Sequence, residues 1–212
     1  MTGVQTCALP ISHVTALFGE GEEDIPSLPL DIIAGLPGIA QQVDRRRLYD
    51  DMVPFGPAYH NAETVYITPQ GASMYVSSGQ GTGDDRILGS PFTLDAAFHG
   101  ACAWGQSLLK FVGFPVALRK RTVHVPTAAG KTYFARVFPR LREKDFFTAD
   151  IFILDEHGTL HETAAGLTMR DTSGGRLAPP AWISGSCGDE PLSILSSRCD
   201  AFAVMELPVI PE

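Results

Sequence analysis

The sequence predicts an α+β fold, in which an antiparallel sheet surrounds one central helix. In residues 45–172, two alternating apolar segments come first, a proline-free segment rich in small apolar residues follows, and four longer alternating segments come last. The small residues of the middle segment would let other backbone approach it closely. A glycine in a helix interior costs roughly 1 kcal/mol, so the two glycines there indicate a helix wrapped by a sheet.

Each element is predicted from its own pattern. The turn Pro69-Gln70-Gly71 joins two short strands, which is a hairpin signal. The helix is expected where Ala, Leu and Phe dominate and proline is absent. The turn Asp155-Glu156-His157-Gly158 joins the last two strands. The predicted ranges are 62–68 and 72–77 for the first strands, 93–111 for the helix, and 115–125, 132–138, 146–154 and 160–170 for the remaining strands.

The flanking regions are interpreted from their composition. Residues 13–18 alternate like the end of a strand, and residues 19–44 combine an acidic run with prolines and glycines, as linkers do. Residues 173–212 begin as a second linker and end in an apolar stretch too short for a core of its own. Residues 1–12 lack the regions of a signal peptide and read as a translated sequencing-library adapter. We therefore expect an artefact there, and a chain that is a fragment.

The composition excludes several classes of protein. Of 212 residues, 44% are hydrophobic and 19% are charged, which is typical of a folded chain rather than a disordered one. The net charge of −8 argues against nucleic-acid binding, and no window approaches the ~18 apolar residues of a membrane span. The four cysteines form no CxxC pair, which argues against zinc and against a disulfide framework and favours a cytoplasmic protein.

Cofactor signals are weak as well. The histidines show no metal-ligand spacing. Residues 79–83 are rich in glycine but lack the strand-to-helix context and the lysine of a phosphate loop. We therefore expect no metal and no nucleotide cofactor.

Two motifs carry a resemblance to a known family. Phe55-Gly56-Pro57-Ala58-Tyr59 resembles the YGPxF segment of polyketide synthase dehydratase domains, and residues 91–99 resemble their P-x-L-L-D-x-x-x-Q/H segment. The two motifs fall in order and at a suitable spacing, so together they are more specific than either alone. Such domains are double hotdogs, with two helix-in-sheet halves in one chain. The resemblance is to the second half, the C-terminal one, and covers residues 45–172.

The resemblance implies that a first half is missing. In the family that half carries a catalytic histidine in an H-x-x-x-G-x-x-x-x-P motif, which is absent around all six histidines of this chain. Residues 13–18 would then be the last strand of the truncated first half. We expect the fragment to be inactive alone. We also expect it to form a homodimer, because a lone half leaves an unpaired edge strand and an uncovered apolar face.

The family's chemistry assigns roles to two residues of the helix. Dehydration of a 3-hydroxyacyl thioester needs one base and one acid. In the family the first-half histidine is the base, and a second-half aspartate, which Asp95 matches, protonates the departing hydroxyl. His99 follows four residues later on the same helical face, where it can orient Asp95. Burial must then outweigh the helix dipole, which favours the anion. The alternatives are that Asp95 caps the helix and that His99 is an ordinary core histidine.

The resemblance also implies contacts with the substrate. Gly56 and Pro57 would shape a turn where the loop meets the substrate tunnel. Phe55 stands where the family often has tyrosine, so a hydroxyl is missing there. The alternative for this loop is a structural turn with aromatic residues in the core. The remaining predicted contacts are Tyr59, Pro91 and Leu94.

Two basic clusters, at residues 45–47 and 119–121, have two interpretations. On a strand, Arg119 and Arg121 would share one face. They would steer an acidic acyl carrier protein, whose phosphopantetheine carries the substrate. The alternative is a solvated basic face. Other domains of the same synthase are the remaining expected partners.

Three functions stay open at this point. The leading interpretation is the second half of a dehydratase, a hydro-lyase, from a polyketide or polyunsaturated fatty acid synthase. It would convert carrier-bound 3-hydroxyacyl thioesters into trans-2-enoyl thioesters. The second is a non-catalytic hotdog that organises the synthase or docks the carrier protein. The third is a hotdog thioesterase in which Asp95 activates water.

Overall fold

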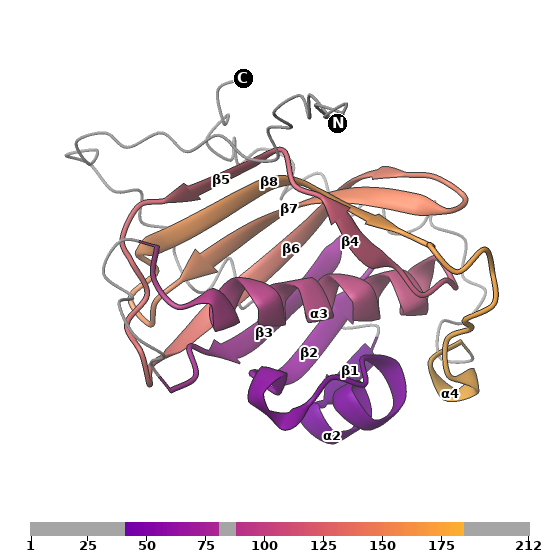
Figure 1. Ribbon diagram of the computed structural model, residues 1–212, viewed down its shortest axis with the longest axis horizontal. Helices are drawn as coiled ribbons and strands as arrows, with labels where there is room; N and C mark the ends of the chain where they lie inside the picture. The colour runs from indigo at the N-terminus through magenta and orange to yellow at the C-terminus, as the bar shows by residue number, and fades with distance from the viewer. Residues whose placement is uncertain (1–40, 81–87, 185–212) are drawn as a thin grey trace, which may run out of the picture.

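The computed structural model describes residues 41–80 and 88–184. Within these residues, eight strands form one antiparallel sheet that curves around the helix α3 (Figure 1). The strand order is β1-β2-β3-β6-β7-β8-β4, and β5 also pairs with β8. The strands are β1 (Gln41–Asp44), β2 (Ala62–Thr68), β3 (Gly71–Ser77), β4 (Phe114–Ala117), β5 (Lys120–Val123), β6 (Thr132–Arg142), β7 (Phe146–Leu154) and β8 (Leu160–Arg170). The predicted α+β fold is therefore confirmed.

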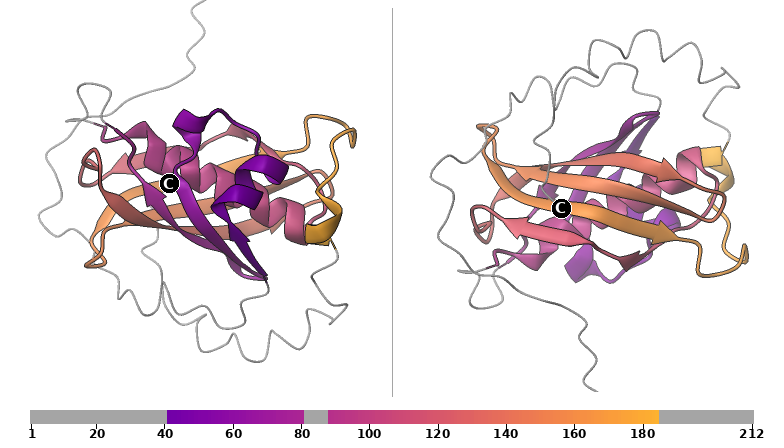
Figure 2. Two further views of the ribbon diagram at one scale, coloured as in Figure 1. Left: turned by 90° about the horizontal axis from the view of Figure 1, so that it is seen from below. Right: turned by 90° about the horizontal axis from the view of Figure 1, so that it is seen from above.

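The helical elements are few. Figure 2 shows α3 from below, behind β1 to β3, and from above, behind β4 to β8. Three short helical segments precede β2, and a last turn follows β8 and packs on α3. The helices are α2 (Arg45–Arg47), the π-helical turn η1 (Leu48–Met52), the 3-10 turn η2 (Pro57–Tyr59), α3 (Pro91–Leu108) and α4 (Ala181–Ser184).

Local chemistry sets the ends of α3. The Ser90 side chain accepts a hydrogen bond from the backbone N–H of Phe92 (3.3 Å), and Pro91 occupies the first helical position, where its missing N–H is not needed. At the other end, Lys110 has φ of +62° and breaks the helix. The helix therefore begins two residues before the predicted start at residue 93 and ends three residues before the predicted end at residue 111.

The glycines of α3 let the sheet pack closely. A Cβ on Gly100 would collide with the Met74 side chain of β3, and a Cβ on Gly105 would lie 2.8 Å from the Phe147 ring of β7. The core between α3 and the inner face of the sheet contains the fully buried Trp104, whose ring meets the Phe147 ring edge-on. The prediction that these glycines serve packing is confirmed.

The predicted strand at 115–125 is divided. Both β4 and β5 pair with β8, but Leu118 and Arg119 between them leave the ladder. The break faces a bulge in β8, where Gly166 adopts φ of +66° and the β7–β8 register shifts. Alternation along residues 115–125 therefore does not continue from Arg119 to Arg121.

The two predicted linkers contain structured parts. Residues 41–44 form β1, where Val43 is fully buried and the Gln41 side chain accepts a hydrogen bond from Ser107 of α3 (2.9 Å). Residues 171–184 return to α3, and Ile183 enters the core. Those segments of the predicted linkers at 19–44 and 173–212 are thus part of the domain. The interpretations of residues 1–12 and 13–18 lie outside the described residues.

Candidate active site

Asp95 and His99 meet one turn apart on α3, as their spacing predicts. His99 Nε2 lies 3.4 Å from Asp95 Oδ2. The His99 side chain is buried, whereas about a third of the Asp95 side chain is exposed, at 35%. Ser90 caps the helix and Asp95 does not, which removes the capping alternative. Asp95 therefore presents a partly exposed carboxyl group beside a buried imidazole, and its buried Oδ2 makes no hydrogen bond in the structure.

Burial shifts both pKa values of this pair. It raises the pKa of Asp95 from 3.8 to about 6, so burial outweighs the helix dipole. Burial, together with a smaller effect of the nearby His60, lowers the pKa of His99 to about 4. At neutral pH the imidazole is neutral, and Asp95 is mostly ionised, with roughly a tenth of it protonated at pH 7. A carboxyl group in this state can give or take a proton.

Tyr49 is a third member of the site that sequence reasoning missed. Its hydroxyl lies 3.2 Å from His99 Nδ1 and accepts a hydrogen bond from the backbone N–H of Ala62 (2.9 Å). Tyr49 belongs to η1 and is almost fully buried. The apolar spacing of Leu48, Tyr49 and Met52 is a helical signal that could have indicated a buried turn there.

The loop with the first motif borders this pair. The Phe55 ring stacks on the His99 ring at 5.0 Å, and half of Phe55 is exposed. His60 holds the loop through a hydrogen bond from Nε2 to the Phe55 carbonyl (2.8 Å), while Asn61 donates to the Ala58 carbonyl (2.9 Å). Gly56 precedes η2 and Pro57 begins it, so both shape the turn as predicted. The phenyl ring thus covers one face of the imidazole.

The other predicted substrate contacts divide into two groups. Tyr59 is exposed and its ring meets Phe92 at 6.1 Å, and Pro91 is exposed at the start of α3. Leu94 instead points into the core and is 7% exposed. The exposed side chains Phe55, Tyr59 and Pro91 lie around the helix end that carries Asp95, whereas Leu94 packs in the core.

The basic residues at 119–121 do not form one surface. Arg121 makes a bidentate ion pair with the buried Glu162 (2.6 and 3.0 Å) and donates to the Leu88 carbonyl. Arg119 instead lines a shallow pocket of about 480 Å³ together with Asp150 and Arg140. The expectation that Arg119 and Arg121 share a face is wrong, because the strand breaks before Lys120.

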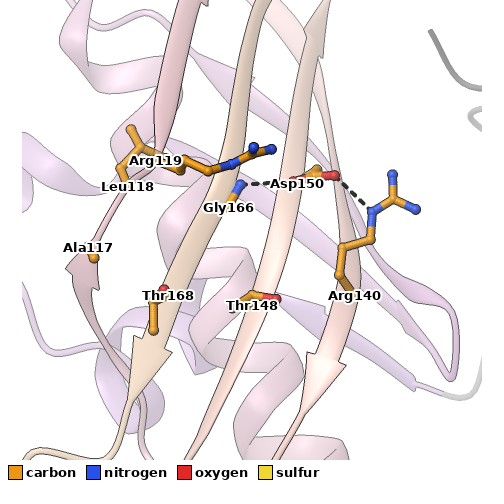
Figure 3. A pocket seen from close by; sticks show the side chains of 8 residues that line it. All are labelled: Ala117, Leu118, Arg119, Arg140, Thr148, Asp150, Gly166 and Thr168. Carbon is orange, nitrogen blue, oxygen red and sulfur yellow. Dashed lines mark hydrogen bonds and ion pairs between the residues drawn. The ribbon is translucent and has the colours of Figure 1, made fainter. Parts of the chain in front are cut away.

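This pocket lies on the outer face of the sheet, with α3 behind it (Figure 3). Asp150 accepts from Arg140 (2.8 Å) and from the backbone N–H of Gly166 (2.9 Å). The pocket is therefore separate from the Asp95 site. The other members of its lining are Ala117, Leu118, Thr148 and Thr168.

The cluster at residues 45–47 serves the fold. Arg45 pairs with Glu63 (3.0 Å), and Arg46 pairs with Asp50 (3.4 Å). The Arg47 guanidinium lies over the Trp182 ring at 5.0 Å. In the described ranges, no group of three or more His, Cys, Asp or Glu side chains could hold a metal ion. No helix in the same ranges is long and apolar enough to cross a membrane.

Solved structures share this architecture. A trans-AT polyketide synthase dehydratase domain from Brevibacillus brevis is 22% identical, with a TM-score of 0.56 over 69% of this chain and 54% of that chain. The CurJ dehydratase, solved as an inactive mutant with a bound compound, is 17% identical, with a TM-score of 0.59 over 72% and 54%. A bifunctional dehydratase-cyclase domain of ambruticin biosynthesis is 19% identical, with a TM-score of 0.52 over 69% and 53%.

These likenesses confirm the hotdog fold, and the chain spans about half the length of each solved structure. No curated protein matches the chain. A family model described as the polyketide synthase dehydratase N-terminal domain matches residues 28–179, which is most of the chain. The matched residues contain both motifs, all eight strands of the described sheet and the Asp95–His99 pair. Of the described elements, α4 lies beyond the match. The chain therefore belongs to the polyketide synthase dehydratase family.

Proposed function

We propose that this chain supplies the acid of a dehydratase that converts carrier-bound 3-hydroxyacyl thioesters into trans-2-enoyl thioesters. One observation carries the proposal. Asp95 is a partly exposed carboxyl group whose pKa burial raises to about 6, and His99 Nε2 lies 3.4 Å from its Oδ2. A general acid is most effective when its pKa lies near the working pH.

The reaction is an elimination of water. A base removes the proton on the carbon next to the thioester carbonyl, and the carbon–hydrogen electrons form the new double bond. The carbon–oxygen bond of the 3-hydroxyl breaks, and Asp95 gives this oxygen the proton that lets it leave as water. The cycle closes when a proton returns from the base side to Asp95. The elimination needs a base and an acid but no redox or phosphoryl-transfer step, so the proposal includes no metal and no nucleotide.

The base is proposed to come from a first hotdog half, which places this chain in the second half. Both motifs support this placement, since they resemble second-half segments and one of them contains Asp95. The matching family model is described as an N-terminal domain, so the placement depends on the motifs. The exposed edge formed by β4, with Phe114 and Val116 at its surface, suits pairing with another half.

The substrate would arrive on the phosphopantetheine of an acyl carrier protein. The exposed rings of Phe55 and Tyr59 beside Asp95 offer an apolar approach for an acyl chain. For the carrier itself, Arg119 remains the proposed contact from the basic cluster, because the Arg121 guanidinium is engaged by Glu162. Other domains of the same synthase would keep the acyl carrier protein close to this chain.

The first prediction tests Asp95 in a two-half protein, in which this chain follows the first hotdog half of a related dehydratase. Asp95→Asn should lower kcat by about 10²–10⁴-fold, because an amide cannot donate the proton that the leaving oxygen needs. Formation of the conjugated enoyl thioester is followed by its absorbance. Asp50→Asn is the matched control, since Asp50 is an exposed carboxylate paired with Arg46. An unchanged kcat in Asp95→Asn refutes the proposed role.

A further inference from the structure

We propose that Tyr49 is a positioning residue for Asp95. Its hydroxyl fixes His99 as the tautomer protonated at Nε2, so that His99 donates to Oδ2 of Asp95 and leaves Oδ1 to carry the transferable proton. This inference rests on the proposed role of Asp95. It concerns, however, a hydrogen-bond arrangement that can be measured without turnover.

The Tyr49 hydroxyl has one hydrogen-bonding role left, that of a donor. Its oxygen accepts a hydrogen bond from the backbone N–H of Ala62 (2.9 Å), and the backbone of Asn61 also interacts with it. With backbone donors occupying its lone pairs, the hydroxyl proton needs an acceptor. His99 Nδ1, at 3.2 Å, is the acceptor in reach. Burial raises the pKa of Tyr49 to about 12, so the hydroxyl keeps its proton at every pH at which the protein works.

His99 must therefore carry its own proton on Nε2. The groups that face the imidazole are Tyr49 from η1, the Phe55 ring and His60 from the loop, and Asp95 from α3. Its lowered pKa of about 4 makes the ring neutral, with one N–H. Because Nδ1 accepts from Tyr49, that N–H is at Nε2, which lies 3.4 Å from Asp95 Oδ2.

The direction of this contact, with Nε2 as donor or as acceptor, decides which oxygen of Asp95 is the acid. Oδ2 is buried and makes no hydrogen bond in the structure, and His99 Nε2 lies 3.4 Å from it, while the side chain as a whole is 35% exposed. The solvent-facing oxygen is therefore Oδ1. An Nε2–H facing Oδ2 leaves the carboxyl proton on Oδ1, where a substrate can take it. The opposite tautomer would present a lone pair to Oδ2 and draw the proton inward.

A tyrosine that merely packs provides the matched control. Tyr133 is 5% exposed, its hydroxyl accepts from the backbone N–H of Ala128 (2.7 Å), and its ring meets the His161 ring edge-on at 4.9 Å. Tyr133→Phe thus removes a buried hydroxyl that serves a backbone amide, as Tyr49→Phe does. It leaves His99 untouched, so only Tyr49→Phe should alter the His99 tautomer.

The experiment is ¹⁵N spectroscopy of the imidazole rings in the full chain at neutral pH, with His99→Gln used to assign the His99 signals. The wild-type chain and Tyr133→Phe should show His99 with Nε2 protonated and Nδ1 unprotonated. Tyr49→Phe should show a mixture in which the Nδ1–H tautomer appears. The Asp95 carboxyl carbon, followed by ¹³C spectroscopy, should titrate at higher pH in Tyr49→Phe, because its anion loses a donor.

Three outcomes overturn the inference: His99 protonated at Nδ1 in the wild-type chain, a tautomer unchanged in Tyr49→Phe, or the same change in Tyr133→Phe. Thermal melting shows whether each variant is folded. If Tyr49→Phe does not fold, the wild-type tautomer still decides, since Nδ1–H there is incompatible with donation by Tyr49. Failure of Asp95→Asn to lower kcat would refute the proposed function and leave the tautomer result standing, so the two failures are distinguishable.

Discussion

Asp95 is held in a state that costs the folded chain stability. Its carboxyl group is shielded enough for burial to raise its pKa to about 6. The folded chain therefore binds a proton more tightly than the unfolded chain does. Stability falls as pH rises from the unfolded pKa near 3.8 to the folded pKa near 6, and the full penalty applies above that. Strain of this kind at one side chain is typical of a functional position.

The second prediction is a pH-dependent gain of stability in Asp95→Asn. At pH 8 the variant should be more stable than the wild-type chain by about 1–2 kcal/mol, a figure discounted for the solvent that reaches this partly exposed carboxyl group. At pH 5, which lies between the unfolded and the folded pKa of Asp95, only about half of this gain should remain. Urea denaturation at both pH values measures it. Equal differences at pH 5 and pH 8 would show that Asp95 titrates normally.

The third prediction separates the two arginines that the sequence grouped together. Arg121→Ala should lower the free energy of unfolding by about 3 kcal/mol, because it leaves the carboxylate of Glu162 buried without its partner. Glu162 is 1% exposed and bonded to both arms of the Arg121 guanidinium. Arg119→Ala is the matched control and should change stability by less than about 0.5 kcal/mol, as is usual for surface substitutions. Similar losses from both variants would contradict the assignment.

At the scale of single residues, the sequence predicted local relations and missed distant ones. The contact of Asp95 with His99 follows from their spacing of four residues on one helix. Tyr49 lies fifty positions from His99 in the chain, so their contact depends on how η1 packs against α3. The same holds for the division of Arg119 from Arg121, which is set by the pairing with β8.

Among the elements, α3 depends most on small residues. Gly105 is an example, since the space for its missing side chain is filled by the ring of Phe147. Phe147 in turn contacts Trp104 and Phe111, so it has little freedom to move. The helix gives up intrinsic propensity at this glycine in exchange for close contact with β7.

The fourth prediction concerns Gly105→Ala. The added methyl group would gain about 1 kcal/mol of helix propensity, but forcing it against Phe147 costs typically 1–3 kcal/mol. We expect a net loss of about 1 kcal/mol in the free energy of unfolding, measured by urea denaturation. Phe147→Leu should then cost less in the Gly105→Ala background than in the wild-type chain. Additive costs would show that the two residues do not share the space.

The element boundaries show where sequence patterns stop being informative. The strands β2, β3, β7 and β8 match their predicted ranges to within one residue, and each of them contributes buried side chains. β1 escaped prediction because it adjoins a segment rich in proline and glycine and has one fully buried residue, Val43. Its pairing with β2 and its bond to Ser107 are tertiary effects that no local pattern encodes.

On the scale of the whole molecule, the sheet ends in an exposed edge. β4 pairs with β8 on one side, all four of its residues are exposed, and Phe114 and Val116 are 37% and 48% exposed. Exposed apolar edge strands pair readily with other chains. In the proposed function, this edge is where a first hotdog half would continue the sheet.

The fifth prediction is that the chain alone self-associates through this edge. Sedimentation velocity at several concentrations should show a dimer at tens of micromolar, because the unpaired strand and its apolar side chains gain a partner. Val116→Lys should shift the population towards monomer, since charged side chains block edge pairing. Leu141→Lys serves as the control for added charge, because Leu141 is as exposed as Val116 but lies on the interior strand β6. A wild-type monomer at these concentrations would show that the edge is closed in another way.

The most direct test of the central claim is complementation of turnover. The claim is that Asp95, beside His99, is one half of an acid–base pair whose other half is a histidine on a first hotdog. The dehydration rate of a 3-hydroxyacyl thioester is measured for this chain alone and after addition of a separately purified first half from a related dehydratase. The account predicts no turnover for the chain alone and turnover after addition, lost in Asp95→Asn. Turnover by the chain alone that depends on Asp95, or thioester hydrolysis in place of dehydration, would contradict it.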